Sequence, residues 1–119
     1  MTGPAAAGAA SDVRIVLITA PSADVAEKLV RALVEEGLAA CGNVVPGVTS
    51  IYRWGGDIHT DAEVLVVLKT TAARVAALME RAPVLHPYDV PEVLVLAVES
   101  GHAPYVAWVH ASTVSGGGA

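Results

Sequence analysis

The sequence is short of basic residues and of long apolar runs, and each shortage excludes a class of protein. It has seven Lys and Arg residues against twelve Asp and Glu, and a formal net charge of −5. Nucleic-acid-binding domains normally carry a basic face, so a nucleic-acid partner is not expected. The apolar runs reach only five or six residues, as at 93–98. A membrane-spanning helix needs about 20, so no membrane partner is expected either.

Cysteine occurs once, as Cys41, and phenylalanine is absent. One thiol cannot form a disulfide within the chain, which is typical of a reducing compartment, and we therefore expect a cytoplasmic protein. Hydrophobic residues still make up 54% of the 119 residues, enough for one domain with a core of Val, Leu, Ile and Ala. The Ala- and Gly-rich ends predict disordered tails at 1–11 and 114–119, around a domain at 12–113.

The spacing of apolar residues predicts an α+β domain of four strands and three helices. Strands are expected at 13–19, 38–54, 58–70 and 93–98, and helices after Ser22, after Thr71 and from about Pro104. Gly55-Gly56 predicts a tight hairpin turn, and Pro46-Gly47 a bulge in an edge strand. The order βαββαβ, followed by a short C-terminal helix, is that of a ferredoxin-like sandwich with an extended β-hairpin.

Both faces of the predicted sheet are apolar. Successive residues such as Val64, Leu65, Val66 and Val67 point to opposite faces, yet all are hydrophobic. A sheet with one face in water alternates polar and apolar residues instead. Two helices cover one face, so the other needs a cover, and another copy of the chain is the simplest one. The alternative is that the short last helix and the tails cover it.

Short motifs spread over the chain belong to one family pattern. They are Leu38-Ala39-Ala40-Cys41, Pro46-Gly47, Ser50-Ile51-Tyr52-Arg53-Trp54, Glu63, Lys69-Thr70, His86-Pro87-Tyr88-Asp89-Val90-Pro91-Glu92, and then Tyr105 and Trp108. From about residue 13 to residue 112 the chain thereby resembles the CutA divalent-cation tolerance family. The resemblance implies a ferredoxin-like fold, a homotrimer similar in plan to PII-type signalling proteins, and a link to copper and other divalent cations.

Two positions depart from the family pattern. Ile18 stands where some members have a cysteine, and Leu85 where some have a second histidine. Thiol and imidazole are ligands that suit copper, so their absence argues against a tight copper site.

His86, Glu92 and Cys41 are the candidate metal ligands. His86 and Glu92 lie six residues apart around a turn with two prolines, where imidazole and carboxylate could meet. Transition metals take three or four protein ligands, so a neighbouring subunit would have to supply the rest. The first hypothesis is therefore a trimer that weakly binds Cu(II) or another divalent cation near subunit boundaries and does not need the metal to fold. The alternatives are a solvated His86, a Glu92 that accepts backbone hydrogen bonds, and a Cys41 packed in the core.

A second hypothesis is a PII-like sensor that holds a small anionic ligand in clefts between subunits. Lys69, Tyr88 and Trp54 would then line the cleft. A third is a trimeric scaffold without a ligand. The sequence has no nucleophile elbow and no glycine-rich phosphate-binding loop, and we do not expect an enzyme.

Asp57, His59 and Asp61 alternate along the predicted third strand, so their side chains share one face. They form either a further divalent-cation site or, as we favour, a charged and solvated hairpin tip.

Overall fold

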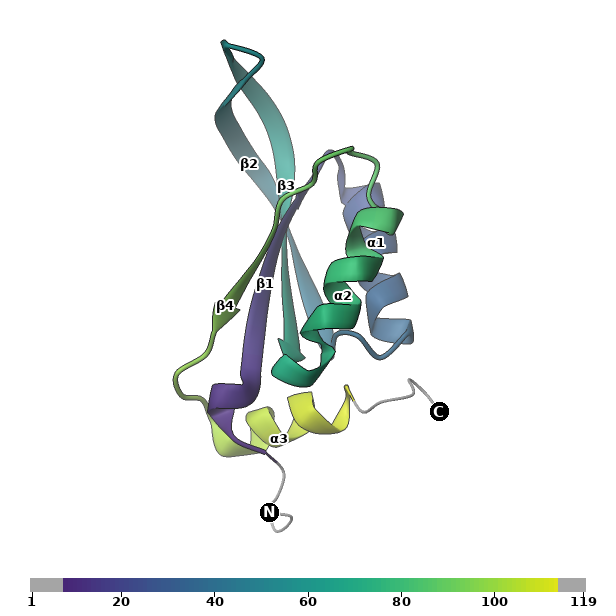
Figure 1. Ribbon diagram of the computed structural model, residues 1–119, viewed down its shortest axis with the longest axis vertical. Helices are drawn as coiled ribbons and strands as arrows, with labels where there is room; N and C mark the ends of the chain where they lie inside the picture. Colours follow the sequence, from purple (N-terminus) through teal and green to yellow (C-terminus); the bar gives the residue numbers. More distant parts are fainter. Residues whose placement is uncertain (1–7, 114–119) are drawn as a thin grey trace.

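The computed structural model describes residues 8–113 and confirms the predicted α+β, ferredoxin-like fold. In chain order the elements are the 3-10 turn η2 (Ala10–Asp12), β1 (Val13–Ala20), α1 (Ala23–Glu35), β2 (Cys41–Trp54), β3 (Asp57–Thr71), α2 (Ala72–Leu85), β4 (Val93–Ala97) and α3 (Ala103–Ala111). The strands form one antiparallel sheet in the order β2-β3-β1-β4. Helices α1 and α2 cover one face of this sheet, and α3 lies at the end where β1 begins (Figure 1).

The ends of α1 follow the predicted capping chemistry. The Ser22 hydroxyl accepts a hydrogen bond from the Val25 backbone N–H at 3.2 Å, as a helix N-cap does. Gly37 has a φ of +73°, a conformation that glycine adopts at little cost and that ends helices. The backbone N–H groups of Leu38 and Ala39 both donate to the Leu33 carbonyl. As a result β2 starts at Cys41 rather than at residue 38.

Helix α2 ends later than its proline suggested. Pro83 lies inside the helix, which continues to Leu85, since proline in the last turn removes only one hydrogen bond. Thr71 occupies the N-cap position, but its hydroxyl pairs with that of Thr113 at 3.4 Å and caps no backbone N–H. None of the helices between residues 8 and 113 combines the length and apolar character that crossing a bilayer requires.

Strands β2 and β3 form a ribbon that projects beyond the rest of the domain (Figure 1). Their 14 and 15 residues far exceed the usual strand length of about 5–6. Gly55 and Gly56, with φ of +63° and +88°, make the predicted tight turn. The predicted bulge is also present, because the pairing register shifts between Val45 and Val48. β2 is an edge strand, which tolerates Pro46.

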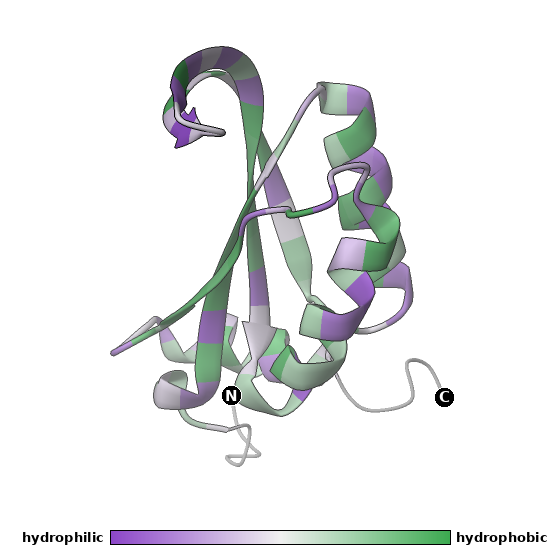
Figure 2. Cartoon of the chain, turned by 45° about the horizontal axis from the view of Figure 1, so that its top comes forward, coloured by the Kyte–Doolittle hydropathy of each residue, from purple (hydrophilic) through white to green (hydrophobic). Residues whose placement is uncertain are grey.

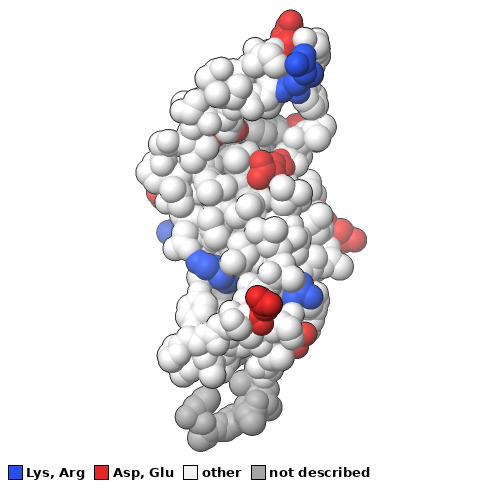
Figure 3. Space-filling view, turned by 90° about the vertical axis from the view of Figure 1, so that its left-hand side faces the viewer, with Lys and Arg blue, Asp and Glu red and all other residues white. Residues whose placement is uncertain are grey.

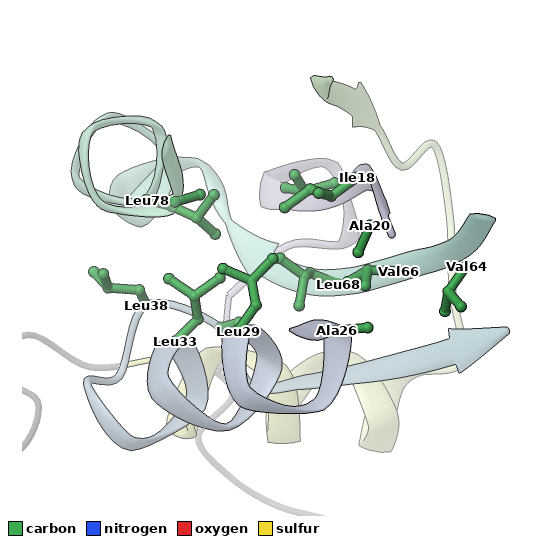
Figure 4. Close-up of a cluster of buried hydrophobic side chains, with 13 residues drawn as sticks. Ile18, Ala20, Ala26, Leu29, Leu33, Leu38, Val64, Val66, Leu68 and Leu78 are labelled. Atoms are coloured by element: carbon green, nitrogen blue, oxygen red, sulfur yellow. The ribbon is translucent and has the colours of Figure 1, made fainter. Parts of the chain in front are cut away.

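The hydrophobic core lies between the sheet and the two long helices (Figure 4). Its fully buried side chains include Ile18 and Leu68 from the sheet, Leu33 from α1 and Leu78 from α2. Hydrophobic residues run along the body of the sheet, while hydrophilic ones gather in the projecting part of the ribbon (Figure 2).

The side of the molecule away from α1 and α2 carries few, scattered charges (Figure 3). This side holds exposed leucines of β4, Leu94 and Leu96. Helix α3 packs only against the end of this face, where Val106 and Val109 contact Val13, so the chain leaves the rest of the face without a helical cover.

Residues 8–11, which were predicted to belong to the first tail, are described. The Nε2 atom of His110 in α3 lies 3.1 Å from the Ala9 carbonyl oxygen, a hydrogen bond that ties this segment to the domain. Residues 1–7 and 114–119, the rest of the predicted tails, lie outside the described part of the chain.

Candidate functional site

His86 is buried where α2 ends, and both of its ring nitrogens are engaged. Nε2 lies 2.8 Å from the carbonyl oxygen of Thr19 on β1, and Nδ1 accepts the backbone N–H of Tyr88 at 3.1 Å. Because a carbonyl can only accept, the proton of the neutral ring is on Nε2. His86 is 7% exposed, so it is not the solvated histidine of the alternative interpretation. A metal ion could bind the ring only after one of these hydrogen bonds broke.

Tyr88 extends this hydrogen-bonded chain to β3. The loop that carries it passes from α2 across β1 to β4 (Figure 1). The Tyr88 hydroxyl donates to Glu63 Oε2 at 2.7 Å, and its ring centroid lies 4.7 Å from that of His86. Burial and the hydrogen bond to Glu63 together raise the pKa of Tyr88 to about 12. Thr19, His86, Tyr88 and Glu63 thus join three separate parts of the chain.

A second tyrosine–carboxylate pair lies on the ribbon, next to the first. Tyr52 donates its hydroxyl proton to Asp61, and this hydrogen bond is the main cause that raises the pKa of Tyr52. The Tyr52 ring also stacks on His59, its cross-strand partner, at 5.5 Å. Asp61 and Glu63 are two residues apart on β3, so both carboxylates face the same side. Tyr52, Asp61, Glu63 and Tyr88 are called the tyrosine–carboxylate cluster below.

A shallow cavity of about 320 Å³, open to solvent, lies beside the bulge, and Glu63 lines it. The other lining residues are Pro21, Gly47, Val48, Thr49, Ala62 and Val64. None of them is basic or aromatic, so Glu63 carries the only formal charge in the wall of the cavity.

The structure does not bring the three predicted metal ligands together. Glu92 is exposed in the loop just before β4, whereas His86 is buried. Cys41 lies at the far end of β3 from Glu63, paired with Lys69, and its Sγ is 3.5 Å from the Tyr105 hydroxyl. Within residues 8–113, no three His, Cys, Asp or Glu side chains are arranged to hold a metal ion. A metal site made by this chain therefore needs ligands from elsewhere.

The residues predicted to line an anion cleft are also far apart within one chain. Trp54 pairs with Asp57 at the ribbon tip, and Lys69 follows twelve residues later on β3. At about 3.3 Å per residue, this separation is about 40 Å. The Lys69 ammonium donates to the Asn43 side-chain oxygen. One cleft could combine these residues only by drawing them from different subunits.

The tyrosines provide a direct test of the site geometry. The pKa values of Tyr88 and Tyr105 are raised to about 12, in Tyr105 chiefly by the hydrogen bond with Cys41, and that of Tyr52 is raised as well. We expect tyrosinate absorbance to appear well above pH 10 in the folded protein and near pH 10 in denaturant. A raised folded-state pKa leaves stability unchanged below pH 10 and lowers it as the pH rises from 10 toward 12. Ultraviolet titration measures the appearance of tyrosinate in the folded and in the denatured protein. Glu63→Gln should bring the pKa of Tyr88 back toward 10.

Comparison with known proteins agrees with these features. Residues 14–112 match the family described as CutA1 divalent ion tolerance protein. The chain is 50% identical to the divalent-cation tolerance protein CutA of Thermus thermophilus, over 83% of this chain and 96% of that protein. It is 49% identical to mouse protein CutA over 82% of this chain, which spans only 55% of the mouse protein. The crystal structure of CutA from Xylella fastidiosa superposes with a TM-score of 0.85 at 39% identity, covering 87% of this chain and all of that one. The chain belongs to the CutA1 divalent ion tolerance family.

Proposed function

We propose that the protein assembles as a homotrimer that weakly binds copper or another divalent cation near its subunit boundaries. The observation that carries this proposal is the apolar, uncovered side of the sheet and ribbon. Leu94 and Leu96 on β4 are 57% and 49% exposed, and Ile51, Trp54 and Ile58 on the ribbon are 58–69% exposed. Large apolar side chains exposed at several points of a soluble domain, here on β4 and on both faces of the ribbon, mark an interaction surface.

The ribbon supports assembly in a second way. It projects beyond its own domain, and the outer edge of β2 leaves backbone N–H and C=O groups without a strand partner (Figure 1). Natural proteins pair or cover such edges. A neighbouring subunit would cover both the ribbon and the apolar face of the sheet.

Cation binding is supported by charge and by the tyrosine–carboxylate cluster. The chain has a net charge of −5, and two carboxylates, Asp61 and Glu63, face one side of β3. Oxygen ligands of this type bind divalent cations. Because one subunit supplies too few ligands, we place the cations where a second subunit adds its own. We further propose that the protein acts in the cytoplasm, and by binding rather than by catalysis.

Native mass spectrometry of metal-stripped and metal-loaded protein tests this proposal. We expect three times the 12.1 kDa subunit mass in both preparations, with additional divalent ions only after loading. Thermal unfolding in Cu(II), Zn(II) or a nucleotide measures binding as well, because a ligand of the folded state raises the midpoint by mass action.

The outcomes separate the hypotheses. A well-folded 12.1 kDa monomer at micromolar concentration would rule out assembly. A midpoint that responds to nucleotide alone would overturn cation binding in favour of an anion sensor. An unfolding midpoint that responds to none of these ligands would favour the third hypothesis, a trimeric scaffold without a ligand.

A further inference from the structure

Glu63 is a buried carboxylate without a basic partner in its own chain. It is 9% exposed. Among residues 8–113 the only ion pair is Arg81–Glu36, which joins the two long helices. Carboxylates are rarely buried unless they are paired with a cation, because removing a charge from water is costly. The hydrogen bond from the Tyr88 hydroxyl to Oε2 offsets part of this cost but supplies no positive charge.

The part of the ribbon beyond the bulge, residues 48–63, has two faces of different chemistry and is called the outer ribbon below. Side chains alternate along each strand, and paired residues of the two strands share a face. One face, the acidic face, holds the aromatic rings of Tyr52 and Trp54 together with every carboxylate of the outer ribbon. These carboxylates belong to Asp57, Asp61 and Glu63.

The opposite face, the basic face, carries the only basic side chain of the outer ribbon, that of Arg53. Ile51 and Ile58 lie on the same face and are 69% and 58% exposed. Among the described residues the Arg53 guanidinium has one hydrogen bond, to the Gly56 carbonyl oxygen at 3.5 Å, which is long for such a bond. The basic face is therefore apolar around one arginine whose charge is available to a partner.

Arg53 cannot reach Glu63 within one chain. Arg53 pairs with Ile58, which lies five residues before Glu63 on β3, about 17 Å away at about 3.3 Å per residue. The side chains of Arg53 and Glu63 also point to opposite faces. The ribbon, however, projects beyond its own domain, so its basic face can lie against the acidic face of another copy (Figure 1).

Contact between two unlike faces determines the kind of assembly that forms. A two-fold dimer places one patch against the same patch, whereas contact between unlike faces is head-to-tail and can close into a ring. A closed ring is the plan of the proposed homotrimer. Each contact would unite one arginine with three carboxylates, so negative charge remains there for the proposed divalent cation.

We propose that the basic face of one subunit's outer ribbon packs on the acidic face of the next, and that Arg53 supplies the positive charge that Glu63 lacks in its own chain. The guanidinium pairs with a carboxylate that Tyr88 already holds through Oε2. Ile51 and Ile58 pack on the aromatic rings of the acidic face. This inference rests on the proposed homotrimer, not on cation binding, and identifies the residues that join its subunits.

A double-mutant cycle on the full-length protein tests the pair, with sedimentation equilibrium as the measurement. Arg53→Met keeps the aliphatic stem, and Glu63→Gln keeps the shape and the acceptor for Tyr88. Each should raise the concentration at which the trimer dissociates at least about tenfold, because each removes one partner of a buried ion pair. The double variant should show about the larger single effect and not the product of both. Arg31→Met, at an exposed arginine of α1, is the matched control and should leave dissociation unchanged.

Cross-linking tests the same contact without dissociating the trimer. In a Cys41→Ser background, Arg53→Cys/Glu63→Cys treated with a short bismaleimide should give three linked subunits on a denaturing gel. Either cysteine alone should give single subunits, because position 53 meets position 63 of the neighbour and not its own equivalent. Unlinked subunits, or effects that multiply in the cycle, would overturn the pairing while native mass spectrometry still showed a trimer. A 12.1 kDa monomer would overturn the homotrimer and the pairing together.

Discussion

Replacing Leu78 with alanine is expected to lower the free energy of unfolding by about 2–5 kcal/mol. Leu78 is fully buried on α2, in the cluster that joins both long helices to the sheet (Figure 4). The substitution removes apolar contact and leaves a cavity, while alanine is at least as good a helix former as leucine. The effect therefore reports packing alone. Since domains of this size are stable by about 5–15 kcal/mol, the loss is a large share of the total.

Val84→Ala on the same helix is the control. Val84 is 72% exposed, so its truncation should change the free energy of unfolding by no more than about 0.5 kcal/mol. Urea unfolding at one fixed protein concentration compares the two, because assembly makes the midpoint depend on concentration. Equal effects at Leu78 and Val84 would contradict the described core.

The double substitution Leu94→Glu/Leu96→Glu is expected to dissociate the proposed trimer and leave the fold intact. These side chains alternate on β4 with Val93 and Val95, which pack against the core. Burial of a leucine is worth about 1.5–3 kcal/mol. Two such losses in each subunit, about 4 kcal/mol, correspond to a roughly thousandfold weaker interface. Four added charges per contact between two mutant subunits would weaken it further by repulsion.

Sedimentation equilibrium measures this effect, and circular dichroism shows whether the fold persists. We expect the double variant to sediment at 12.1 kDa under conditions in which the unmodified protein is larger. Val84→Glu/Val90→Glu is the matched control, because these valines are 72% and 68% exposed but belong to α2 and the loop that follows it. This control should remain assembled. If both double variants stay assembled, the sheet face is not the interface.

Structural features that depend on residues adjacent in the sequence could be predicted from the sequence. The helix cap at Ser22, the helix end at Gly37 and the turn at Gly55-Gly56 follow from the conformational preferences of those residues. The two long strands followed from apolar runs. Where competing local contacts decide a boundary, the prediction was off by a few residues, as at the start of β2.

The candidate site was harder to predict because its contacts join distant parts of the chain. His86 and Thr19 are 67 residues apart, and Tyr88 and Glu63 are 25 apart. No local pattern shows that these pairs meet. The alternation of His59, Asp61 and Glu63 along one strand was nevertheless visible, and extending it from Asp61 to Glu63 would have reached the buried carboxylate. The motif residues His86 and Tyr88 were identified from the sequence, the first as a metal ligand and the second as part of an anion cleft, and both assignments stay predictions; the hydrogen bond between them was not foreseen.

The bulge between Val45 and Val48 also constrains how the ribbon can change in length. Two residues of β2 there, Pro46 and Gly47, oppose one residue of β3, Val64, so the bulge sets which side chains of the outer ribbon point toward the body. Deleting one residue from the bulge would turn Tyr52 and Trp54 to the opposite face, because side-chain direction alternates at every position. Related chains can therefore lengthen or shorten this arm in steps of two residues per strand, while odd steps invert it.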